Sequence, residues 1–528
     1  MDTKALRQKI LDLAIRGRLV PQDPNDEPAS LLLERIREEK KQMVKEGKLK
    51  AKDIKNDTII FKGEDNLHYE KFQDGTVKCI EEEIPFDVPN GWEWCRLSNI
   101  CLILNGDRGQ NYPAKSKLHS EGIPFVSASN IIDGEVSTEG LLYLSDEQYD
   151  LLGAGKLELN DIVFCIRGSL GKCGYFTMEK GAIASSLVIV RAISNKEYLN
   201  GYIFNYLNSL FAYDEIKKYD NGSAQPNLAA KDFQNFLVPL PANEEIGRIS
   251  DKCELLLMNE NNISVATEEL QDCISNTKSK ILDLAIRGKL VPQNPNDEPA
   301  SILLKRIREE KESLIKQGKI KHDKKESIIY KGDDNSYYEL IGNSTKCIDD
   351  EIPFEVPNGW SWARGKNIFV PMESRKPTGE TFDYIDIDSI DNKNNIVTEP
   401  KHLFSSEAPS RASRAVFNGS VVFSTVRPYL KNIAYIDERL ENCIASTGFY
   451  ICTSNGALYP QYMFLLMISH YVVNGLNQYM KGDNSPSINK DDIDNWLFPI
   501  PPYNEQIRIQ EKVHSCLNNI IEIGANLL

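Results

Sequence analysis

The sequence lacks the signatures of the common enzyme classes. It contains no Gly-x-x-x-x-Gly-Lys-Ser/Thr phosphate loop, no Gly-x-Gly-x-x-Gly and no Gly-x-Ser-x-Gly nucleophile elbow. Its 6 histidines show no metal-ligand spacing, and its 11 cysteines form no Cys-x-x-Cys pair of the kind found in zinc sites. We therefore expect a reduced protein that is not an enzyme and that binds no metal or cofactor of its own.

Long hydrophobic runs are missing as well. No apolar stretch approaches the ~20 residues that a membrane span requires, and segment 1–7 lacks the apolar core of a secretion signal. A hydrophobic content of 41% nevertheless indicates packed cores, and 528 residues are enough for two domains with connecting elements. We expect a cytoplasmic protein without membrane contact.

The chain as a whole also lacks the positive charge that usually accompanies phosphate contacts. Its net charge of −15 makes tight, unaided binding to DNA less favourable. Acidic runs such as 81–83 and 349–351 lie in the repeated segments described next. A local basic face within a larger complex is still compatible with this composition.

What the chain does contain is an internal repeat. Segments 9–40 and 280–311 are identical at 28 of 32 positions, and shorter echoes join 79–92 to 347–360 and 239–241 to 499–501. The segments between these blocks, 93–225 and 361–485, have little in common. A repeated frame that carries two different inserts indicates one kind of task performed on two targets, which favours recognition over catalysis.

Two long helices are predicted from a heptad-like pattern. The apolar 3-4 alternation from Ile246 to Leu284 predicts a helix over about 244–286, ended by Gly288. The same apolar alternation occurs at 506–527 and continues at 3–13. The C-terminal and N-terminal segments together would therefore form a second copy of the long helix. We expect an antiparallel, circularly permuted helix pair with pseudo-twofold symmetry. The alternative is two unrelated terminal helices that pack on their own domains.

The predicted fold class is mixed α/β, with two target-recognition domains separated by this long coiled-coil pair. The expected parts are the N-terminal piece of the second spacer helix (1–16), the first frame segment (17–91), the first recognition domain (92–243), the central spacer helix (244–287), the second frame segment (288–359), the second recognition domain (360–503) and the C-terminal piece of the second spacer helix (504–528).

Each part has its own pattern. The frame helices expected at 29–46 and 300–317 carry dense charge on one face, which suits a solvated or subunit-docking surface better than nucleic acid. The inserts open with Asn-Gly-Trp-x-Trp turns at 90 and 358. Strands are predicted at 123–127, 161–168, 186–190, 382–387, 420–427 and 448–452, and helices at 202–217 and 459–479.

Three polar loops in each insert carry side chains suited to bases and phosphates. The loops are 105–112, 167–172 and 219–227 in the first insert, and 371–377, 427–431 and 480–487 in the second. Arg, Lys, Asn, Gln and Ser on such loops are typical of DNA contacts, although ordinary surface turns look alike. The candidate DNA-binding residues are Arg108, Gln110, Asn111, Arg167, Ser169, Lys172, Asn221, Ser223, Gln225, Arg375, Lys376, Arg427, Tyr429, Lys431, Lys481, Asn484 and Ser487.

Two further patterns resemble catalytic sites but do not support one. In Ile500-Pro-Pro-Tyr503 an isoleucine stands where amino-methyltransferases need an amide or carboxylate to hold the target amine. Asp383, Asp386, Asp388 and Asp391 suggest a nuclease metal site, and the alternation predicts Asp386 and Asp388 on one face of a strand. The first insert has no equivalent cluster, so a metal site is disfavoured.

Taken in order, several segments resemble the specificity subunit of Type I restriction–modification enzymes. The resemblance rests on Ala5-x-x-x-x-Ile-Leu-x-x-Ala-Ile-x-Gly17 with Leu19-Val-Pro21, on Val421-Val-Phe-Ser-Thr-Val-Arg-Pro-Tyr-Leu-Lys431 with Ala445-Ser-Thr-Gly448, and on the Pro-Leu/Ile-Pro entry into each long helix. It covers nearly the whole chain, including the two unlike inserts in a repeated frame.

The resemblance implies a role and a set of partners. Each insert would read one half of a bipartite site in double-stranded DNA, and the helices would set the gap and dock two modification (methyltransferase) subunits. The implied complex methylates adenine with S-adenosylmethionine. With restriction (translocase/endonuclease) subunits it also uses ATP and magnesium to translocate and cut DNA. This chain would bind none of these cofactors, and its acidity is understandable if the methyltransferase subunits also hold the DNA.

The residues alone leave another function open. A coiled-coil scaffold with two protein-binding domains and no role with DNA would show the same repeat and helices. A methyltransferase fused to its own specificity region is disfavoured, because the catalytic motifs are missing.

Overall fold

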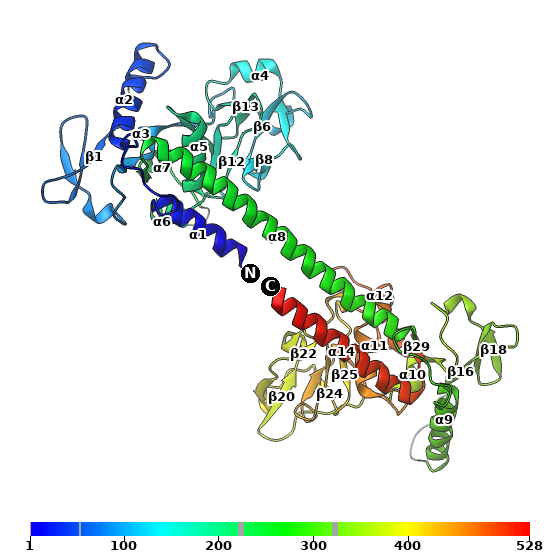
Figure 1. Ribbon diagram of the computed structural model, residues 1–528. Helices are drawn as coiled ribbons and strands as arrows, with labels where there is room; N and C mark the ends of the chain where they lie inside the picture. The colour runs from blue at the N-terminus through cyan, green and yellow to red at the C-terminus, as the bar shows by residue number, and fades with distance from the viewer. Residues whose placement is uncertain (1, 52–53, 220–225, 319–325, 528) are drawn as a thin grey trace. The chain divides into compact units, whose positions relative to one another are not determined.

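The computed structural model describes residues 2–51, 54–219, 226–318 and 326–527, in two compact units, Met1–Thr267 and Glu268–Leu528 (Figure 1). Each unit is built from a frame, an insert of sheets and helices, and part of a long helix. No helix within the described ranges is long and apolar enough to cross a membrane.

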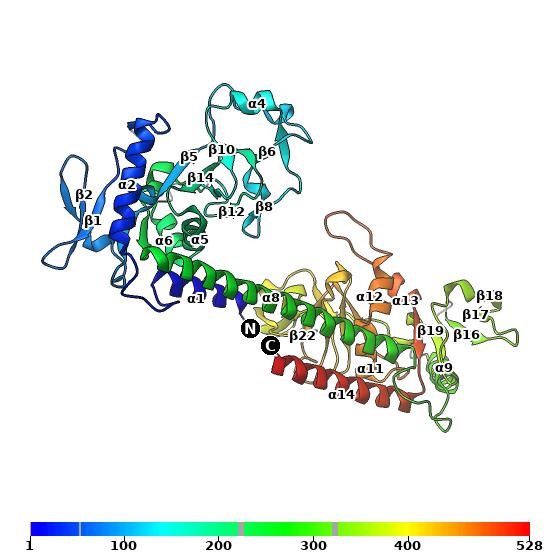
Figure 2. The ribbon, with the colours of Figure 1, turned by 45° about the horizontal axis from the view of Figure 1, so that its top comes forward.

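The frame of unit 1 consists of two helices and a small antiparallel sheet. In α1 (Thr3–Ile15), the N-cap side chain of Asp2 accepts a hydrogen bond from Ala5 N at 3.0 Å. After α2 (Ala29–Lys45), three short strands pair in chain order and lie beside α2 (Figure 2). These strands are β1 (Ile59–Lys62), β2 (His68–Lys71) and β3 (Val77–Cys79).

Unit 2 repeats this frame. The predicted charged helices are confirmed as α2 and α9 (Ala300–Lys316), and a second meander follows α9. The meanders were not predicted, because their strands span only three to five residues and carry no sustained alternation. The second meander contains β16 (Ser327–Lys331), β17 (Tyr337–Ile341) and β18 (Ser344–Cys347).

The central helix α8 is continuous from Asn243 to Ile286, in agreement with the predicted range of about 244–286. Its start packs in the core of unit 1 through Ile246, Ile249 and Cys253, together with Ile10 of α1. Arg7 of α1 also donates to the Glu260 carboxylate at 3.0 Å. The buried apolar face of α8 is interrupted at Ile263, which is 39% exposed. The pattern therefore predicts the helix correctly but overstates the continuity of its buried face.

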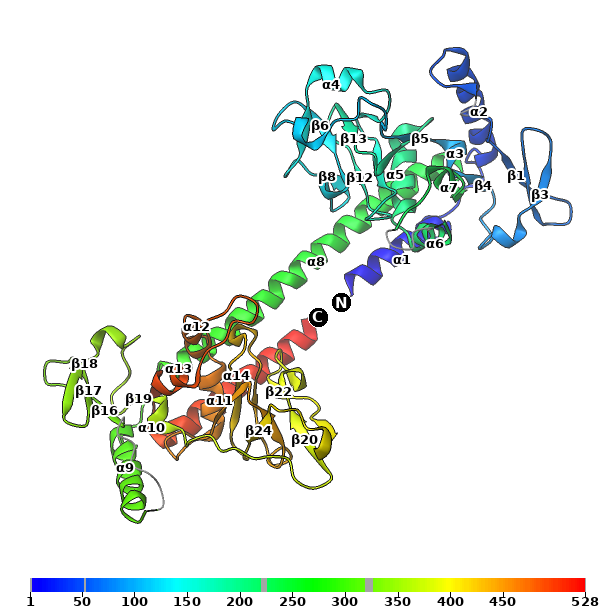
Figure 3. The ribbon, with the colours of Figure 1, turned by 180° about the vertical axis from the view of Figure 1, so that it is seen from behind.

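The last part of α8 and the terminal helix α14 (Tyr503–Leu527) belong to the core of unit 2. Leu282, Ala285 and Ile286 of α8 join Ile509 and Val513 of α14 in one hydrophobic cluster. Helix α11 also packs against α14 (Figure 3). The apolar spacing that predicts these helices thus serves packing within each unit.

The insert of unit 1 contains a six-stranded and a four-stranded sheet. The strand orders are β5-β14-β11-β12-β8-β7 and β10-β13-β6-β9. The predicted strands at 123–127, 161–168 and 186–190 are confirmed as β6, β11 and β14. The bounds are β5 (Cys101–Asn105), β6 (Ile123–Val126), β7 (Ile131–Ile132), β8 (Glu135–Val136), β9 (Leu142–Leu144), β10 (Lys156–Glu158), β11 (Ile162–Cys165), β12 (Cys173–Tyr175), β13 (Lys180–Ile183) and β14 (Leu187–Ala192).

The insert of unit 2 has related sheets with fewer strands. Their orders are β26-β25-β28, β23-β20-β27-β24 and β21-β22. The three strands predicted in this insert correspond to β20, β25 and β28. The bounds are β20 (Thr381–Ile385), β21 (Ile390–Asp391), β22 (Ile396–Val397), β23 (Lys401–Phe404), β24 (Ala412–Ala415), β25 (Val421–Ser424), β26 (Ile433–Tyr435), β27 (Ile444–Ser446) and β28 (Phe449–Cys452).

Each insert is closed by a pair of strands from its two ends. β4 (Glu93–Arg96) pairs with β15 (Leu237–Leu240), and β19 (Ser361–Arg364) pairs with β29 (Leu497–Ile500), both antiparallel. The Asn-Gly-Trp-x-Trp turn therefore feeds an aromatic strand, as predicted. Trp94 and Trp362 on these strands are almost fully buried.

Each predicted helix at 202–217 and 459–479 is in fact two helices. Unit 1 has α5 (Lys196–Leu207) and α6 (Leu210–Tyr219), and unit 2 has α11 (Pro460–Ile468) and α12 (His470–Asn477). Ser209 Oγ donates to Tyr206 O and accepts from Ala212 N, and Ser469 makes the equivalent bonds. A buried serine thus satisfies the end of one helix and the start of the next, which ends the continuous helix.

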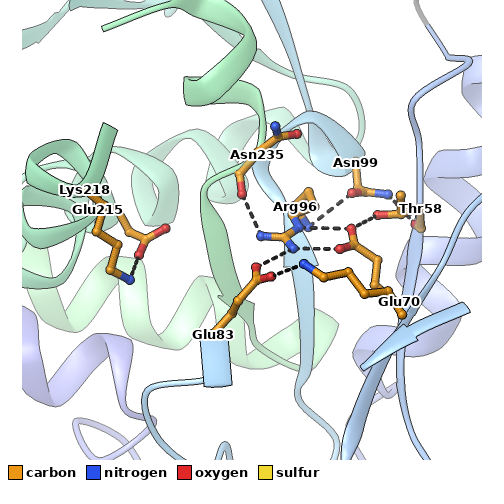
Figure 4. A network of polar contacts seen from close by, with 9 residues as sticks. Thr58, Glu70, Glu83, Arg96, Asn99, Glu215, Lys218 and Asn235 are labelled. Atoms are coloured by element: carbon orange, nitrogen blue, oxygen red, sulfur yellow. Dashed lines mark hydrogen bonds and ion pairs between the residues drawn. The ribbon is translucent and has the colours of Figure 1, made fainter. Parts of the chain in front are cut away.

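A buried ion cluster joins the frame to the insert in unit 1 (Figure 4). Arg96 of β4 binds the Glu70 carboxylate at 2.7 Å and Glu83 at 2.8 Å, and it donates to Asn235 O at 2.9 Å. Burial alone would raise the pKa of Glu70, but hydrogen bonds from Arg96 and Thr58 outweigh it and lower that pKa. One guanidinium therefore ties the meander to both closing strands.

Unit 2 contains the same cluster. Arg364 binds Glu339 at 2.8 Å and Glu351 at 2.6 Å, and it donates to Asn495 O at 2.8 Å. The two frames therefore share this ion cluster as well as the same order of backbone elements.

Candidate nucleic-acid interface

In unit 1, two of the predicted loops leave the same end of the six-stranded sheet. β14 pairs with β5 through Val188 and Asn105, and with β11 through Leu187 and Cys165. The loop after β5 and the loop after β11 therefore begin next to the start of β14. They carry Arg108, Gln110 and Asn111, and Arg167, Ser169 and Lys172, respectively.

The end of the third loop joins them. Asn227 pairs with Arg167, whose Nε donates to Asn227 Oδ1 at 3.1 Å. Leu228 N donates to Ile166 O at 2.9 Å, which aligns the return of this loop with the strand end. Asn221, Ser223 and Gln225, the other candidates on this loop, lie outside the described residues.

The other side chains of these loops donate to neutral oxygens. Arg108 Nη2 lies 3.3 Å from Ser185 O, Asn111 Nδ2 lies 3.0 Å from Leu151 O, and Lys172 Nζ lies 3.1 Å from Ala128 O. Arg108, Gln110, Ser169 and Lys172 are exposed. The structure therefore gathers the described candidates of unit 1 around one sheet end.

Unit 2 brings its later two loops together in the same way. Arg427 N donates to Pro486 O at 2.8 Å, and Arg427 Nη2 donates to Asn484 O at 2.7 Å. Lys481 and Ser487 exchange backbone hydrogen bonds of 3.0 Å, so the last loop is a tight hairpin. Arg427, Lys481 and Asn484 are exposed beside one another.

The first loop of unit 2 is arranged differently. Arg375 N donates to Ser413 O at 3.0 Å, and its guanidinium lies 5.4 Å from the centre of the Phe417 ring. Its Nη1 atom also lies 3.4 Å from Glu441 O. Arg375 is therefore directed toward the neighbouring sheet rather than toward Arg427, whereas Lys376 is exposed.

The structure shifts the alignment of the two middle loops by one residue. Gly168 N donates to Pro226 O as Arg427 N does to Pro486 O, so Arg427 corresponds to Gly168 and not to Arg167. Lys431, which like Gly171 lies just before the returning strand segment, corresponds to that glycine. All four residues are left-handed, with φ of 79° and 82° for the glycines and 47° and 54° for Arg427 and Lys431.

Left-handed backbone is costly for residues that carry a Cβ atom. The cost is roughly 1–2 kcal/mol per residue, which glycine avoids. Unit 2 therefore holds two basic side chains at positions where glycine would stabilise the fold. Strain of this kind is typical of functional loops, because another requirement keeps the strained side chains in place.

The cationic side chains of the loops differ from those of the frame in the groups that they contact. Frame arginines such as Arg248 and Arg508 bind the carboxylates of Asp26 and Asp297. Arg108, Arg167, Lys172 and Arg427 donate only to carbonyl or amide oxygens in the contacts given above, so their charges are not neutralised there. Partial burial lowers the pKa of the Lys431 ammonium, and a nearby anion would oppose that shift.

Sequence reasoning missed one further segment in each unit, at different places in the fold. In unit 1 it is the short helix η4 (Ala128–Asn130) between β6 and β7, where Ala128 O accepts from Lys172. In unit 2 it is the turn between β21 and β22, where Asn392 Nδ2 donates to Leu430 O at 2.9 Å and Asn395 Nδ2 donates to Lys431 O at 3.0 Å. The run Asp391-Asn-Lys-Asn-Asn395 is a turn signal that could have indicated this loop.

The aspartates of unit 2 are arranged differently from the sequence prediction. β20 ends at Ile385, so the prediction that Asp386 and Asp388 share a strand face is wrong: Asp386 caps the short helix η6 (Ile387–Ser389). Lys401 forms ion pairs with both carboxylates. Among the described residues no group of His, Cys, Asp or Glu could hold a metal ion.

Known proteins resemble this chain in sequence. Residues 89–269 match the family model of the Type I restriction modification DNA specificity domain. The Escherichia coli EcoAI specificity subunit is 28% identical over 97% of this chain and 88% of its own length. The E. coli EcoEI specificity subunit is 30% identical over 70% of this chain, and the match spans 62% of that subunit.

A solved structure, the HsdS subunit from Thermoanaerobacter tengcongensis, is 37% identical over 33% of this chain and 46% of that chain, with a TM-score of 0.31. The matches to the family model and to the two E. coli subunits lead to one conclusion. Over nearly its whole length the chain is similar to Type I restriction enzyme specificity subunits, and its residues 89–269 match their DNA specificity domain.

Proposed function

We propose that this chain is the DNA-binding specificity subunit of a Type I restriction–modification complex, in which each insert reads one half of a bipartite target. The observation that supports this most directly is the group of cations around one sheet end of unit 1 and on the paired loops of unit 2, whose contacts are to neutral oxygens. Phosphates are the natural counter-charge for such a group, and guanidinium groups are suited to guanine edges. A protein scaffold without a role with DNA would not require these cations to stay uncompensated.

The DNA-reading surface comprises the candidate loops in each unit. In unit 1 it includes Arg108, Gln110, Asn111, Arg167, Ser169 and Lys172, with Asn221, Ser223 and Gln225 on the third loop. In unit 2 it includes Arg427, Tyr429, Lys431, Lys481, Asn484 and Ser487, with Arg375 and Lys376 more peripheral. The recognition domains would span 92–243 and 360–503.

The helices supply the spacing in this proposal. Residues 244–287 form the central spacer, and 504–528 with 1–16 form its permuted antiparallel partner. The frame segments 17–91 and 288–359 connect spacers to domains. A helix of 44 residues spans roughly 65 Å at 1.5 Å per residue, which suits a ruler between two half-sites.

The subunit is a recognition component and not itself an enzyme, as the names of its relatives as specificity subunits indicate. Two modification subunits would dock on the helices and methylate adenine, and restriction subunits would add translocation and cleavage. S-adenosylmethionine, ATP and magnesium would be bound by those partners. They would also supply positive surface that a chain of net charge −15 lacks.

The proposal is tested by mapping methylated adenines in DNA from cells with and without this chain. We expect a bipartite motif with a fixed gap that is present only when the chain is expressed. A motif that persists without the chain, or the absence of any bipartite motif in cells that also produce the modification subunits, would refute a specificity role.

Arg427→Gly is expected to stabilise unit 2 and to weaken DNA binding. Relief of the left-handed strain should raise the free energy of unfolding by roughly 1 kcal/mol. Loss of the guanidinium should cost about 1–3 kcal/mol of binding, with relaxed specificity if it reads a base, or a flatter salt dependence if it contacts a phosphate. Thermal unfolding and DNA titrations of the assembled complex measure the two effects.

Asn335→Gly is the matched control, because Asn335 has φ of 66° in the meander of unit 2, away from the loops. It should leave DNA affinity unchanged. If Arg427→Gly binds DNA with unaltered affinity and salt dependence, Arg427 is not a DNA contact.

A further inference from the structure

A short turn in unit 2 exposes two large apolar side chains between two cations. The helix η8 (Pro428–Leu430) carries Tyr429, which is 45% exposed, and Leu430, which is 40% exposed. Arg427 precedes it and Lys431 follows it, both in the left-handed conformation. Exposed apolar side chains at the tip of a functional loop indicate a surface that is covered when a ligand binds.

The turn is held in one conformation. The buried Pro428 fixes its own φ, and Lys431 N donates to Pro428 O at 2.9 Å. Leu430 N donates to Arg427 O at 2.9 Å, while Leu430 O accepts from Asn392 at 2.9 Å. η8 also packs on α12. Tyr429 and Leu430 are therefore presented on a braced projection, so little conformational entropy is lost when they are buried.

The corresponding turn of unit 1 is different. Gly168-Ser-Leu-Gly171 has a serine and a leucine between glycines, and only a single apolar side chain, that of Leu170, which is partly covered. Ser169 is exposed but small and polar. Unit 1 thus offers no aromatic projection at the equivalent place.

DNA is the occupant that the flanking charges favour. Arg427 and Lys431 stand on either side of the apolar tip, with Lys481 on the adjacent hairpin, an arrangement that suits phosphates on both sides of a base step. Apolar side chains contact DNA favourably at base faces, and proteins that place an apolar wedge between bases partly unstack and kink the duplex.

We propose that η8 acts as a wedge, in which Tyr429, with Leu430 beside it, inserts against the bases of the second half-site and unstacks one base step, while unit 1 leaves its half-site stacked. This inference rests on the proposed DNA-reading function and adds an asymmetry to it: one half-site is read with deformation and the other without. The deformability of the second half-site would then contribute to specificity.

The test uses the complete complex with its modification subunits and duplexes that carry the mapped target. 2-Aminopurine, whose fluorescence rises when it is unstacked, replaces each purine of both half-sites in turn. Flipping of a target adenine by the modification subunits should give signals in both half-sites. The wedge should give an additional signal in one half-site only.

The double variant Tyr429→Ala/Leu430→Ala should abolish that additional signal and weaken binding by about 5- to 150-fold, the range expected for loss of stacking on one base. Tyr429→Phe should keep both, because it retains the ring. Tyr330→Ala/Ile341→Ala in the meander of unit 2, whose side chains are 44% and 40% exposed and lie outside the candidate loops, is the matched control and should change neither. Thermal unfolding and size-exclusion chromatography establish that each variant folds and assembles.

Several outcomes would overturn the wedge. The signals of the two half-sites could be equal in the wild type, or the additional signal could survive in the double variant. Weaker binding without any unstacking signal would make these residues edge contacts. Weaker assembly with unchanged DNA affinity would make η8 a subunit interface. Failure of the proposed function itself would look different, because the wild-type complex would then neither bind nor methylate a bipartite site.

Discussion

Arg96→Ala is expected to destabilise unit 1 by about 3–5 kcal/mol, because removal of one partner leaves a buried charge without compensation. Glu70 is 4% exposed and binds Arg96 through two nitrogens, at 3.0 Å and 2.7 Å. Without the guanidinium, its carboxylate keeps only a hydroxyl donor, that of Thr58 at 2.6 Å. Asn235 O, which precedes the closing strand β15, also loses its donor.

Thermal unfolding measures this effect, at about 2–4 °C per kcal/mol for a unit of this size. The equivalent variant Arg364→Ala removes the same cluster from unit 2 and should destabilise that unit alone. Comparison of the two variants assigns the unfolding transitions to the units, since the clusters are alike and the inserts differ.

A compensated variant separates charge from packing. Arg96→Met combined with Glu70→Gln and Glu83→Gln leaves no unpaired buried charge, so it should recover most of the stability lost in Arg96→Ala. If the compensated variant is as unstable as Arg96→Ala, the uncompensated carboxylate is not the cause. The cluster would then stabilise unit 1 mainly by its packing.

Exchange of the first insert should change one half of the target and leave the other half intact. The structure locates the junctions: Leu97 N donates to Phe236 O at 2.9 Å, directly beside the paired strands β4 and β15. Replacement of residues 97–236 with the insert of another specificity subunit would retain Arg96, although Asn235 would come from the donor. Because the insert leaves and rejoins the frame at neighbouring residues, a foreign insert can be closed without distortion of the frame.

Methylation mapping of cells that express the chimera reads out both half-sites. The reciprocal exchange of residues 365–496 uses the same junction in unit 2, where Gly365 N donates to Trp496 O at 3.1 Å. It should change only the other half-site. A change of both half-sites by either exchange, or the loss of all recognition from a chimera that folds and assembles, would contradict modular reading.

The exchange of the second insert and the point variants at Arg427 and Tyr429 act on the same loop of unit 2. An exchange of the second insert would carry Arg427, Tyr429 and Lys431 away together, and with them any deformation of that half-site. The point variants distinguish their roles, because Arg427→Gly acts on charge and backbone strain while Tyr429→Phe leaves both unchanged.

The sequence by itself determined the repeat, the long helices and the family resemblance. Helix α8 could be bounded to within one residue because apolar spacing at 3.6 residues per turn is a local property that glycine and proline interrupt. The unlike inserts between like frames also indicated two recognition domains, because segments of one chain can be compared without coordinates.

Only the tertiary structure decided how the loops meet. The breaks at Ser209 and Ser469 depend on buried hydroxyl groups, and the meanders depend on strand partners, neither of which a periodicity of one segment reveals. The correspondence of Arg427 with Gly168 follows from hydrogen bonds to residues about 60 positions away. Backbone conformation at these loops is set by such distant partners, and so the strain at Arg427 and Lys431, together with the projection of Tyr429 between them, could be recognised only in the folded chain.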